Sequence, residues 1–346
     1  MKTGVLIINL GTPNSPRVAD VRRYLREFLM DSRVIDIPYL RRFFLVQSLI
    51  VPFRSRSSAK AYQQLWTEKG SPLKVYGYEV REHLQEALGD SFSVSLAMRY
   101  QQPSIQEGLA QLKKESLKQI VVLPLYPQYA SASSGSTHEA VMNHVASWEV
   151  IPDLHFISKF FEHPDFIHAF TSLGKEYLDK NTYDHIVFSY HGLPERQIRK
   201  AACKNYCQLN DTCCANYHQL NEYCYRAQCF ETSRLLASSL KIHQEQYTVS
   251  FQSRLGRDPW IKPYTDEVIT QLAAHKVQRV LVFSPSFVAD CLETTVEIAD
   301  EYKELFLKAG GQELTLVQSL NTHPLWIQCL KSLVLETLRS NKPISI

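Results

Sequence analysis

The sequence predicts an α/β protein made of two Rossmann-like domains, each a parallel sheet flanked by helices. Apolar runs of strand length recur along the 346 residues, and each is followed by a turn rich in Pro, Gly or Ser and then by a helical pattern. The runs occupy residues 4–13, 91–100, 119–127, 185–194, 246–256 and 278–285. Continuous apolar strands that alternate with helices are typical of parallel sheets covered on both faces.

A weak internal repeat predicts the division into two halves. Residues 120–141 and 280–302 both run from an apolar strand through Pro, an aromatic residue and small residues to a Thr-x-Glu on a helix. The interval from Pro127 to Thr137 equals that from Pro285 to Thr295. We therefore expect one domain over residues 1–155 and a second over 156–346, with a last helix that can pack back on the first domain.

The composition indicates an ordinary globular protein. The chain is 45% hydrophobic and 21% charged, and its formal net charge of +3 gives no case for nucleic-acid binding. The apolar run at the N-terminus is too short for a signal peptide, and no run approaches the ~18 residues of a membrane-spanning helix. We expect a cytoplasmic protein with reduced thiols.

An acidic segment, "SPSFVADCLETTVEIADEY", follows the strand-like run 278–285. Its acids are Asp290, Glu293, Glu297, Asp300 and Glu301. At ~100° per helical residue they project into one arc of roughly 100°. A solvated acidic face is the simpler interpretation. However, like charges three or four residues apart repel, and ligands bind at the carboxyl ends of strands in open α/β sheets. The alternative is a site for a cation.

The stretch "FSYHGLPER" places His191 at the end of a strand in the strand-like run 185–194, in the same half of the chain. If both strands belong to one sheet, the imidazole and the carboxylates can face each other. They can then form a transition-metal site with N and O ligands or a proton-transfer pair. Trp260 lies on the loop after another strand, where it can pack in the core or stack against a flat ligand.

Two segments depart from the repeat. Residues 39–66 contain an uncharged stretch, 43–53, bordered by Arg41, Arg42, Arg54, Arg56 and Lys60. This segment is either a core helix with basic ends or an exposed apolar lip, which would suit a membrane interface or a flat apolar ligand with acidic substituents.

The second segment, residues 200–229, holds six of the eight cysteines. They are Cys203, Cys207, Cys213, Cys214, Cys224 and Cys229. In a reduced compartment such clustering indicates metal, either zinc or an iron–sulfur cluster, unless the thiols are merely buried. The spacing does not choose four ligands among six cysteines.

Taken together, six motifs in this order resemble the ferrochelatase family. They are "INLGTP", "MRY", "LYPQY", "SYHGLPER", "FQSRLGRDPWIKPYTDE" and "SFVADCLETTVEI", and the resemblance runs from about residue 4 to about 330. It implies two Rossmann-like domains with a porphyrin cleft between them. It also implies a lyase that inserts Fe²⁺ into protoporphyrin IX during heme synthesis.

The resemblance also implies roles for single residues. His191 and Glu293 match the catalytic histidine and glutamate, and Asp290 and Glu297 match the supporting acids. All four are expected to contact the metal. The expected porphyrin contacts are Leu10, Arg54, Arg56, Tyr62, Ser71, Arg99 and Trp260. How proton abstraction and metal binding divide between His191 and Glu293 stays open.

The insertion chemistry needs no cofactor, and Fe²⁺ is a substrate. Because some ferrochelatases carry a [2Fe–2S] cluster, the resemblance favours this cluster over zinc, with ligands among Cys203, Cys207, Cys213, Cys214 and Cys224. Cys229 is expected to be structural. Residues 39–56 are expected to contact the inner face of the membrane, and the chain to be a monomer or homodimer. Two alternatives stay open: a chelatase for coproporphyrin or another tetrapyrrole, and a heme or iron carrier or iron–sulfur sensor.

Overall fold

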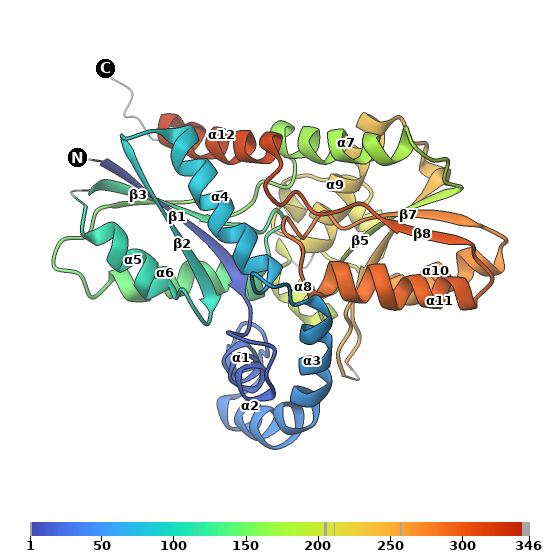
Figure 1. Ribbon diagram of the computed structural model, residues 1–346, viewed down its shortest axis with the longest axis horizontal. Helices are drawn as coiled ribbons and strands as arrows, with labels where there is room; N and C mark the ends of the chain where they lie inside the picture. Colours follow the sequence, from blue (N-terminus) through green and yellow to red (C-terminus); the bar gives the residue numbers. More distant parts are fainter. Residues whose placement is uncertain (1, 116, 204–205, 211, 257, 341–346) are drawn as a thin grey trace. The chain divides into compact units, whose positions relative to one another are not determined.

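The computed structural model describes residues 2–115, 117–203, 206–210, 212–256 and 258–340 (Figure 1). By their internal contacts these residues form two compact units. The first unit takes in residues 2–126, 131–159 and 321–340, and the second takes in 127–130 and 160–320. The chain thus leaves the first unit after Lys159, and its last helix belongs to that unit.

The first unit contains a four-stranded parallel sheet in the order β2-β1-β3-β4. The strands are β1 (Lys2–Gly11), β2 (Phe92–Tyr100), β3 (Leu117–Pro124) and β4 (Asp153–Phe156). Residues 5–8 of the central strand β1 are buried without alternation. This burial is expected for a parallel strand that is covered on both faces.

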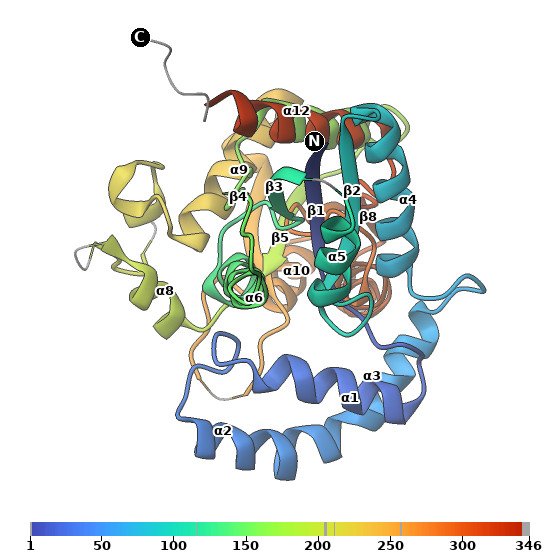
Figure 2. The same cartoon turned by 90° about the vertical axis from the view of Figure 1, so that its left-hand side faces the viewer.

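Helices cover both faces of this sheet. On one face, α5 (Ile105–Lys113) and α6 (Ser136–Val145) pack against Leu6, Ile8 and Val122. On the other, α4 (Pro72–Leu88) packs on β1 and β2, and α12 (Pro324–Ser340) packs on α4 and β3. The remaining helices of the unit are α1 (Val18–Met30), α2 (Tyr39–Phe44), the π-helices η1 (Leu45–Ile50) and η2 (Ser131–Gly135), and α3 (Val51–Leu65). Figure 2 shows α1 beside α3, beyond the carboxyl end of β1.

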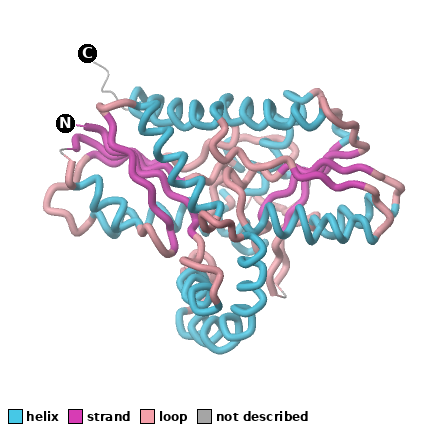
Figure 3. The backbone as a smooth tube through the Cα atoms, viewed as in Figure 1, coloured by secondary structure: helices cyan, strands magenta, loops and turns pink. Residues whose placement is uncertain are grey.

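The second unit repeats this plan. Its parallel sheet has the order β6-β5-β7-β8, which is the order of the first sheet with four added to each number. The strands are β5 (His185–His191), β6 (Tyr247–Gln252), β7 (Arg279–Phe283) and β8 (Glu313–Leu316). The prediction of an α/β protein with two parallel sheets, each flanked by helices, is confirmed (Figure 3).

The helices of the second unit also cover both faces. On one face, α10 (Thr265–Ala274), the π-helix η7 (Leu292–Tyr302) and α11 (Lys303–Lys308) pack on Val187, Val280 and Val282. On the other, Gly174 of α7 (Pro164–Leu178) lies against Phe283, and α9 (Tyr225–Leu240) packs on α7 and β6. The shorter helices are α8 (Glu195–Ala201), η4 (Thr212–Cys214), η5 (Gln219–Asn221) and η6 (Gln244–Gln246).

The sequence prediction missed the edge strands β4 and β8 and mistook the hydrogen bonding of the acidic helix. Each edge strand has four residues with mixed burial, so neither gives a continuous apolar run. The segment Leu292–Tyr302 is a π-helix, whereas an α-helical period was expected. Its i→i+5 bonds widen each turn, and Thr294 and Ile298 are buried.

Candidate active site

The candidate site of the second unit lies at the carboxyl ends of its central strands. His191 is the last residue of β5 and stands in register with Gln252, the last residue of β6. The segment that leads to η7 follows β7, on the other side of β5. The chain therefore changes sides around β5, and such a switch point is where open α/β sheets bind their ligands.

The His191 ring is oriented by the backbone of the next residue. Its Nδ1 lies 2.6 Å from the carbonyl oxygen of Gly192. Because a carbonyl oxygen only accepts hydrogen bonds, Nδ1 carries the proton. In the neutral ring Nε2 is then unprotonated, and no described residue hydrogen-bonds to it. The imidazole is thus arranged as a base with a free acceptor nitrogen.

Gly192 allows two elements to approach the site closely. A Cβ at this position would lie 2.8 Å from the Gln252 carbonyl oxygen and 3.1 Å from the Trp260 ring. Trp260 is anchored by its indole N–H, which donates to the Leu255 carbonyl at 2.9 Å. The rings of Trp260 and Phe287 lie 6.3 and 6.4 Å from that of His191. The predicted ligand residue Trp260 is therefore a neighbour of His191.

Gln252 connects the histidine turn to the acidic helix. Its backbone carbonyl accepts the Gly192 N–H at 2.8 Å. Its side-chain amide donates to the Glu293 carbonyl at 2.9 Å and to the Glu297 carboxylate at 3.1 Å. Its side-chain oxygen accepts from Ser189. The structure thus brings together His191, Glu293 and Glu297 through one buried residue.

The acids of this segment have different surroundings. Glu297 accepts hydrogen bonds from Gln252, Ser253 and Tyr302. Burial, and then the charges of Glu297 and Asp300, raise the pKa of Glu301. Asp290 instead accepts the backbone N–H of Ser319 at 3.1 Å, so one of its oxygens holds a neighbouring loop.

Cys291 lies beside Glu293 with its thiol buried. Burial, and then the charge of Glu293, raise the pKa of this thiol well above its usual range. The thiol therefore stays protonated at neutral pH, and the site presents carboxylates rather than a thiolate.

In the first unit, three predicted porphyrin contacts are engaged with protein groups. Ser71 accepts a hydrogen bond from Thr12, which directly follows β1. Leu10 is the second-last residue of that strand. The ring of Tyr62 meets that of Tyr24 edge-on. Arg99 pairs with the buried carboxylate of Asp31 at 2.6 Å and donates to Ser136 at 2.7 Å.

The segment of residues 39–56 exposes most of its large apolar side chains. They are Tyr39, Leu40, Phe43, Phe44, Leu49 and Phe53. Arg54 and Arg56 are exposed beside them, and neither guanidinium has an ion-pair partner among the described residues. Arg42 is the exception in the predicted basic border, because it is buried and donates to the carbonyls of Ile35 and Ile37. Of the two interpretations, the exposed apolar lip describes this segment and the core helix does not.

The comparison with known proteins decides the family. The family model described as Ferrochelatase matches residues 2–338. The chain belongs to the ferrochelatase family. The ferrochelatase of Legionella pneumophila strain Philadelphia 1 is 47% identical over 336 residues, which are 97% of this chain and 99% of that protein. The ferrochelatase of Coxiella burnetii strain Dugway 5J108-111 is 44% identical over 338 residues, 98% of this chain and 94% of that protein. The predicted enzyme, a lyase that inserts Fe²⁺ into a porphyrin in heme synthesis, is confirmed at the level of the family.

Among solved structures, the chain is similar to SirB from Bacillus subtilis with Fe³⁺. The TM-score is 0.55 at 14% identity, over 97% of this chain and 96% of SirB. This likeness supports the chelatase fold. No helix within the described ranges is long and apolar enough to cross a membrane.

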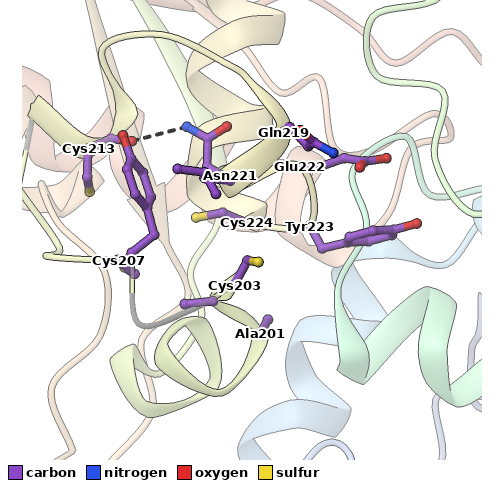
Figure 4. Close-up of a pocket in the computed structure, with 12 residues that line it drawn as sticks. Ala201, Cys203, Cys207, Cys213, Gln219, Asn221, Glu222, Tyr223 and Cys224 are labelled. Carbon is purple, nitrogen blue, oxygen red and sulfur yellow. Dashed lines mark hydrogen bonds between the residues drawn. The ribbon is translucent and has the colours of Figure 1, made fainter.

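Compared with the rest of the chain, the described part of the cysteine segment 200–229 has little regular structure. The described part consists of short helices joined by loops, and residues 204, 205 and 211 lie outside the description. Asn221 holds the segment together by donating to the carbonyls of Cys213 and Asn216 (Figure 4). A cavity of about 260 Å³ is lined by Cys203, Cys207, Cys213 and Cys224, among others.

Four of the five candidate ligands interact through their thiols. Hydrogen bonding from Cys224 lowers the pKa of Cys207 and of Cys214 to about 6, and the same contacts raise that of Cys224. The sulfurs of Cys213 and Cys214 lie 3.8 Å apart. Cys203 is exposed at the cavity wall. Soft thiolate donors thus gather here, but no group of three or more His, Cys, Asp or Glu in the described residues is arranged around a metal position.

Sequence reasoning missed two residues of this site. Gln252 could have been found as a polar residue at the end of an apolar strand, as His191 was. Tyr225 gave no such signal, because it follows Cys224 directly and reads as part of the cysteine segment. Its hydroxyl donates to the His191 carbonyl at 2.9 Å.

Proposed function

We propose that this chain inserts Fe²⁺ into protoporphyrin IX, with His191 accepting a pyrrole proton and Glu293 binding the incoming ion or relaying protons. The orientation of His191 carries this proposal, since its ring donates from Nδ1 to Gly192 and keeps Nε2 as a free acceptor. Gln252 holds this turn beside the acidic helix. Metal insertion replaces two pyrrole protons by one cation. This exchange needs a base to accept protons and carboxylates to bind the cation.

The physical role of the site is to make a slow exchange fast. A planar porphyrin keeps its N–H protons within the ring, so the nitrogen lone pairs are poorly available to a metal. Bending the ring exposes them, and contacts remote from the ring centre can supply the energy for bending. Trp260 and the proposed contacts Leu10, Arg54, Arg56, Tyr62, Ser71 and Arg99 would serve that purpose. Asp290, Glu297 and the acids that follow them would guide cations or protons.

The decisive experiment is anaerobic insertion of Fe²⁺ into protoporphyrin IX, followed as loss of porphyrin fluorescence. We expect turnover by the wild type and loss of at least ~100-fold in kcat for His191→Ala and for Glu293→Gln, with porphyrin binding retained. Full turnover by His191→Ala would remove the histidine from the role of base. Tight porphyrin binding by a wild type without turnover would favour the carrier or sensor.

The apolar lip favours protoporphyrin over coproporphyrin as the substrate. Additional propionates would lose water against the side chains of Phe43, Phe44 and Phe53 without gaining partners. One propionate can pair with Arg54 or Arg56, whose guanidiniums are exposed next to the lip. The comparison of kcat/KM for the two porphyrins tests this choice, and a higher value for coproporphyrin would reverse it.

The same lip is proposed to touch the inner face of the cytoplasmic membrane. Its exposed aromatic side chains and its neighbouring arginines are the combination that binds the interface of anionic lipids. The chain would then be a cytoplasmic protein that binds peripherally to the membrane surface. It would act as a monomer or homodimer.

We further propose that the cysteine segment binds a [2Fe–2S] cluster through Cys207, Cys213, Cys214 and Cys224. The mutual contacts of these thiols support this set over one that includes the exposed Cys203. A cluster of this type would supply a thiolate-bound iron centre, which the insertion chemistry does not use. We expect visible absorbance from protein purified without air, lost in Cys214→Ser and kept in Cys329→Ser, a buried thiol outside the segment. A colourless wild type would exclude the cluster.

A further inference from the structure

The peptide group between His191 and Gly192 is held from both sides. Its N–H, which belongs to Gly192, donates to the Gln252 carbonyl at 2.8 Å. Its C=O, which belongs to His191, accepts from the Tyr225 hydroxyl at 2.9 Å. The next carbonyl, that of Gly192, accepts the imidazole Nδ1–H. The direction of the His191 ring therefore depends on the orientation of a peptide group that Tyr225 and Gln252 fix together.

Tyr225 belongs at the same time to the cysteine segment. It is the first residue of α9 and directly follows Cys224. The next residue, Arg226, donates to the Asn210 carbonyl at 2.9 Å and makes longer contacts of 3.4 Å with the Lys262 carbonyl. Asn210 accepts the backbone N–H of Cys213, and Lys262 lies two residues after Trp260. Residues 224–226 thus connect the thiols to both the histidine turn and the Trp260 loop.

We propose that Tyr225 is a positioning residue for His191, and that the cysteine segment acts on iron insertion through it. This inference rests on the proposed function of His191. The Tyr225 hydroxyl lies 2.9 Å from the His191 carbonyl oxygen, which only accepts hydrogen bonds, so the hydroxyl is the donor. Its effect on His191 depends on where the start of α9 lies. Under this proposal, a change in the bonding of Cys224, the residue before Tyr225, would move that start.

The test is Tyr225→Phe, with Tyr190→Phe as the matched control. Tyr190 is also buried, at 0% exposure against 7% for Tyr225, and its hydroxyl also joins β5 to α9, by a hydrogen bond of 2.8 Å to Ser233. Both variants lose one buried hydroxyl between the same two elements, so similar falls in thermal stability are expected. Only Tyr225→Phe frees the His191 carbonyl. We expect the kcat of Tyr225→Phe to fall ~10-fold or more, while its KM and its affinity for porphyrin stay at the wild-type values. Tyr190→Phe should keep the wild-type kcat.

A second readout is independent of turnover. The rate at which diethyl pyrocarbonate acylates His191, measured by mass spectrometry of its peptide, should fall in Tyr225→Phe, because a weaker Nδ1–H bond to the Gly192 carbonyl makes the unprotonated Nε2 less nucleophilic. It should stay unchanged in Tyr190→Phe. Equal behaviour of the two variants in both measurements would overturn the role of Tyr225.

The link to the cysteines is tested by a double-mutant cycle with Cys207→Ser. We expect Cys207→Ser to lower kcat in the wild type and to have a much smaller effect in Tyr225→Phe. An absent effect of Cys207→Ser, or effects that multiply independently, would overturn the link. A wild type that inserts no iron would instead contradict the proposed function, so the two failures are distinguishable.

Discussion

Gln252 illustrates how much a single buried polar side chain can organise. It is almost completely buried, and its amide serves Ser189, the Glu293 carbonyl and the Glu297 carboxylate. Buried hydrogen-bonding groups that lose their partner cost about 1–3 kcal/mol each. The amide therefore both stabilises the sheet end and fixes the first turn of the acidic helix.

Replacing Gln252 by Met keeps the length of the side chain and removes its hydrogen bonds. We expect the free energy of unfolding to fall by about 1–3 kcal/mol and kcat for iron insertion to fall with it, because Glu293 and Glu297 lose their common donor. Urea denaturation and initial rates measure the two effects. Gln271→Met, at an exposed position on α10, should change neither. An unchanged kcat in Gln252→Met would show that the acidic helix is positioned without this side chain.

Asp31 makes the stability of the first unit sensitive to acid. Although burial alone raises the pKa of this carboxyl, hydrogen bonds from Ser136, the Arg33 N–H and Tyr100, together with the charge of Arg99, lower it below its usual range. A carboxyl whose pKa is lower in the folded state stabilises the fold above its unfolded pKa. That stabilisation is lost as the pH falls through the folded pKa.

The expected consequence is measurable as a pH-dependent free energy of unfolding. In the wild type this free energy should decrease as the pH is lowered from about 5 through the pKa range of carboxyl groups. Asp31→Asn should be less stable at neutral pH and should lose less on acidification. Asp153→Asn, which changes an exposed acid, serves as the control. Parallel pH curves for wild type and Asp31→Asn would contradict the assignment.

The site residues that could be predicted from the sequence are those whose relevant neighbours are close to them in the chain. His191 stands at the end of an apolar run beside Gly192, and the carboxylates of the acidic helix are close together in the chain. Tyr225 and Gln252 contact the same turn, although they lie 34 and 61 residues after His191 in the sequence. Their roles come from strand register and helix packing, which a pattern of residue types does not encode.

At the scale of elements, the sequence did not predict the hydrogen-bond pattern of the acidic helix. The apolar pattern of Leu292–Tyr302 fits a helix, but an i→i+5 ladder differs from an i→i+4 ladder by a shift of one residue in every bond. In the observed π-helix, Val296 and Ile298 are buried, and Ile298 belongs to the core cluster of the second unit. The short edge strands β4 and β8 were missed because half-buried strands of four residues give no apolar run.

The apolar lip carries a prediction at this same scale. Phe53 is 77% exposed and Leu49 is 56% exposed, so neither contributes much to the core. We expect the double substitution Leu49→Ser and Phe53→Ser to leave thermal stability nearly unchanged and to reduce flotation with vesicles that contain anionic lipid.

Ile151→Ser is the control for the lip, because Ile151 is 55% exposed on a loop outside the segment 39–56. It should float with the vesicles as the wild type does. Equal flotation of the wild type and the double variant would exclude the lip as the membrane contact.

At the scale of the whole molecule, the two units share one plan. Both sheets have the strand order in which the first strand is central, the second lies on one side and the third and fourth lie on the other. The internal repeat from Pro127 to Thr137 and from Pro285 to Thr295 marks the equivalent segments after β3 and β7. This likeness was visible in the sequence because it concerns strands, turns and intervals rather than side-chain contacts.

The last helix completes the first unit, and Trp326 is its largest buried side chain. We expect Trp326→Ala to lower the free energy of unfolding by about 3–5 kcal/mol through the cavity it leaves. Gln328→Ala, at an exposed position on the same helix, should change it by less than about 0.5 kcal/mol. Urea denaturation distinguishes these values, and a small effect of Trp326→Ala would show that α12 is dispensable to the first unit.

The position of α12 in the chain affects how the protein is made. Residues 160–320 are translated after β4 and before this helix, so the first unit is interrupted by all of the second except residues 127–130. At ribosomal rates of ~5–20 residues per second, that interval lasts on the order of ten seconds. During this time the nascent sheet displays the apolar surface that α12 will cover, and the second unit completes its sequence before the first does. The unit that begins first is therefore the one that finishes last, and its uncovered apolar surface is the kind that makes incomplete chains prone to aggregate.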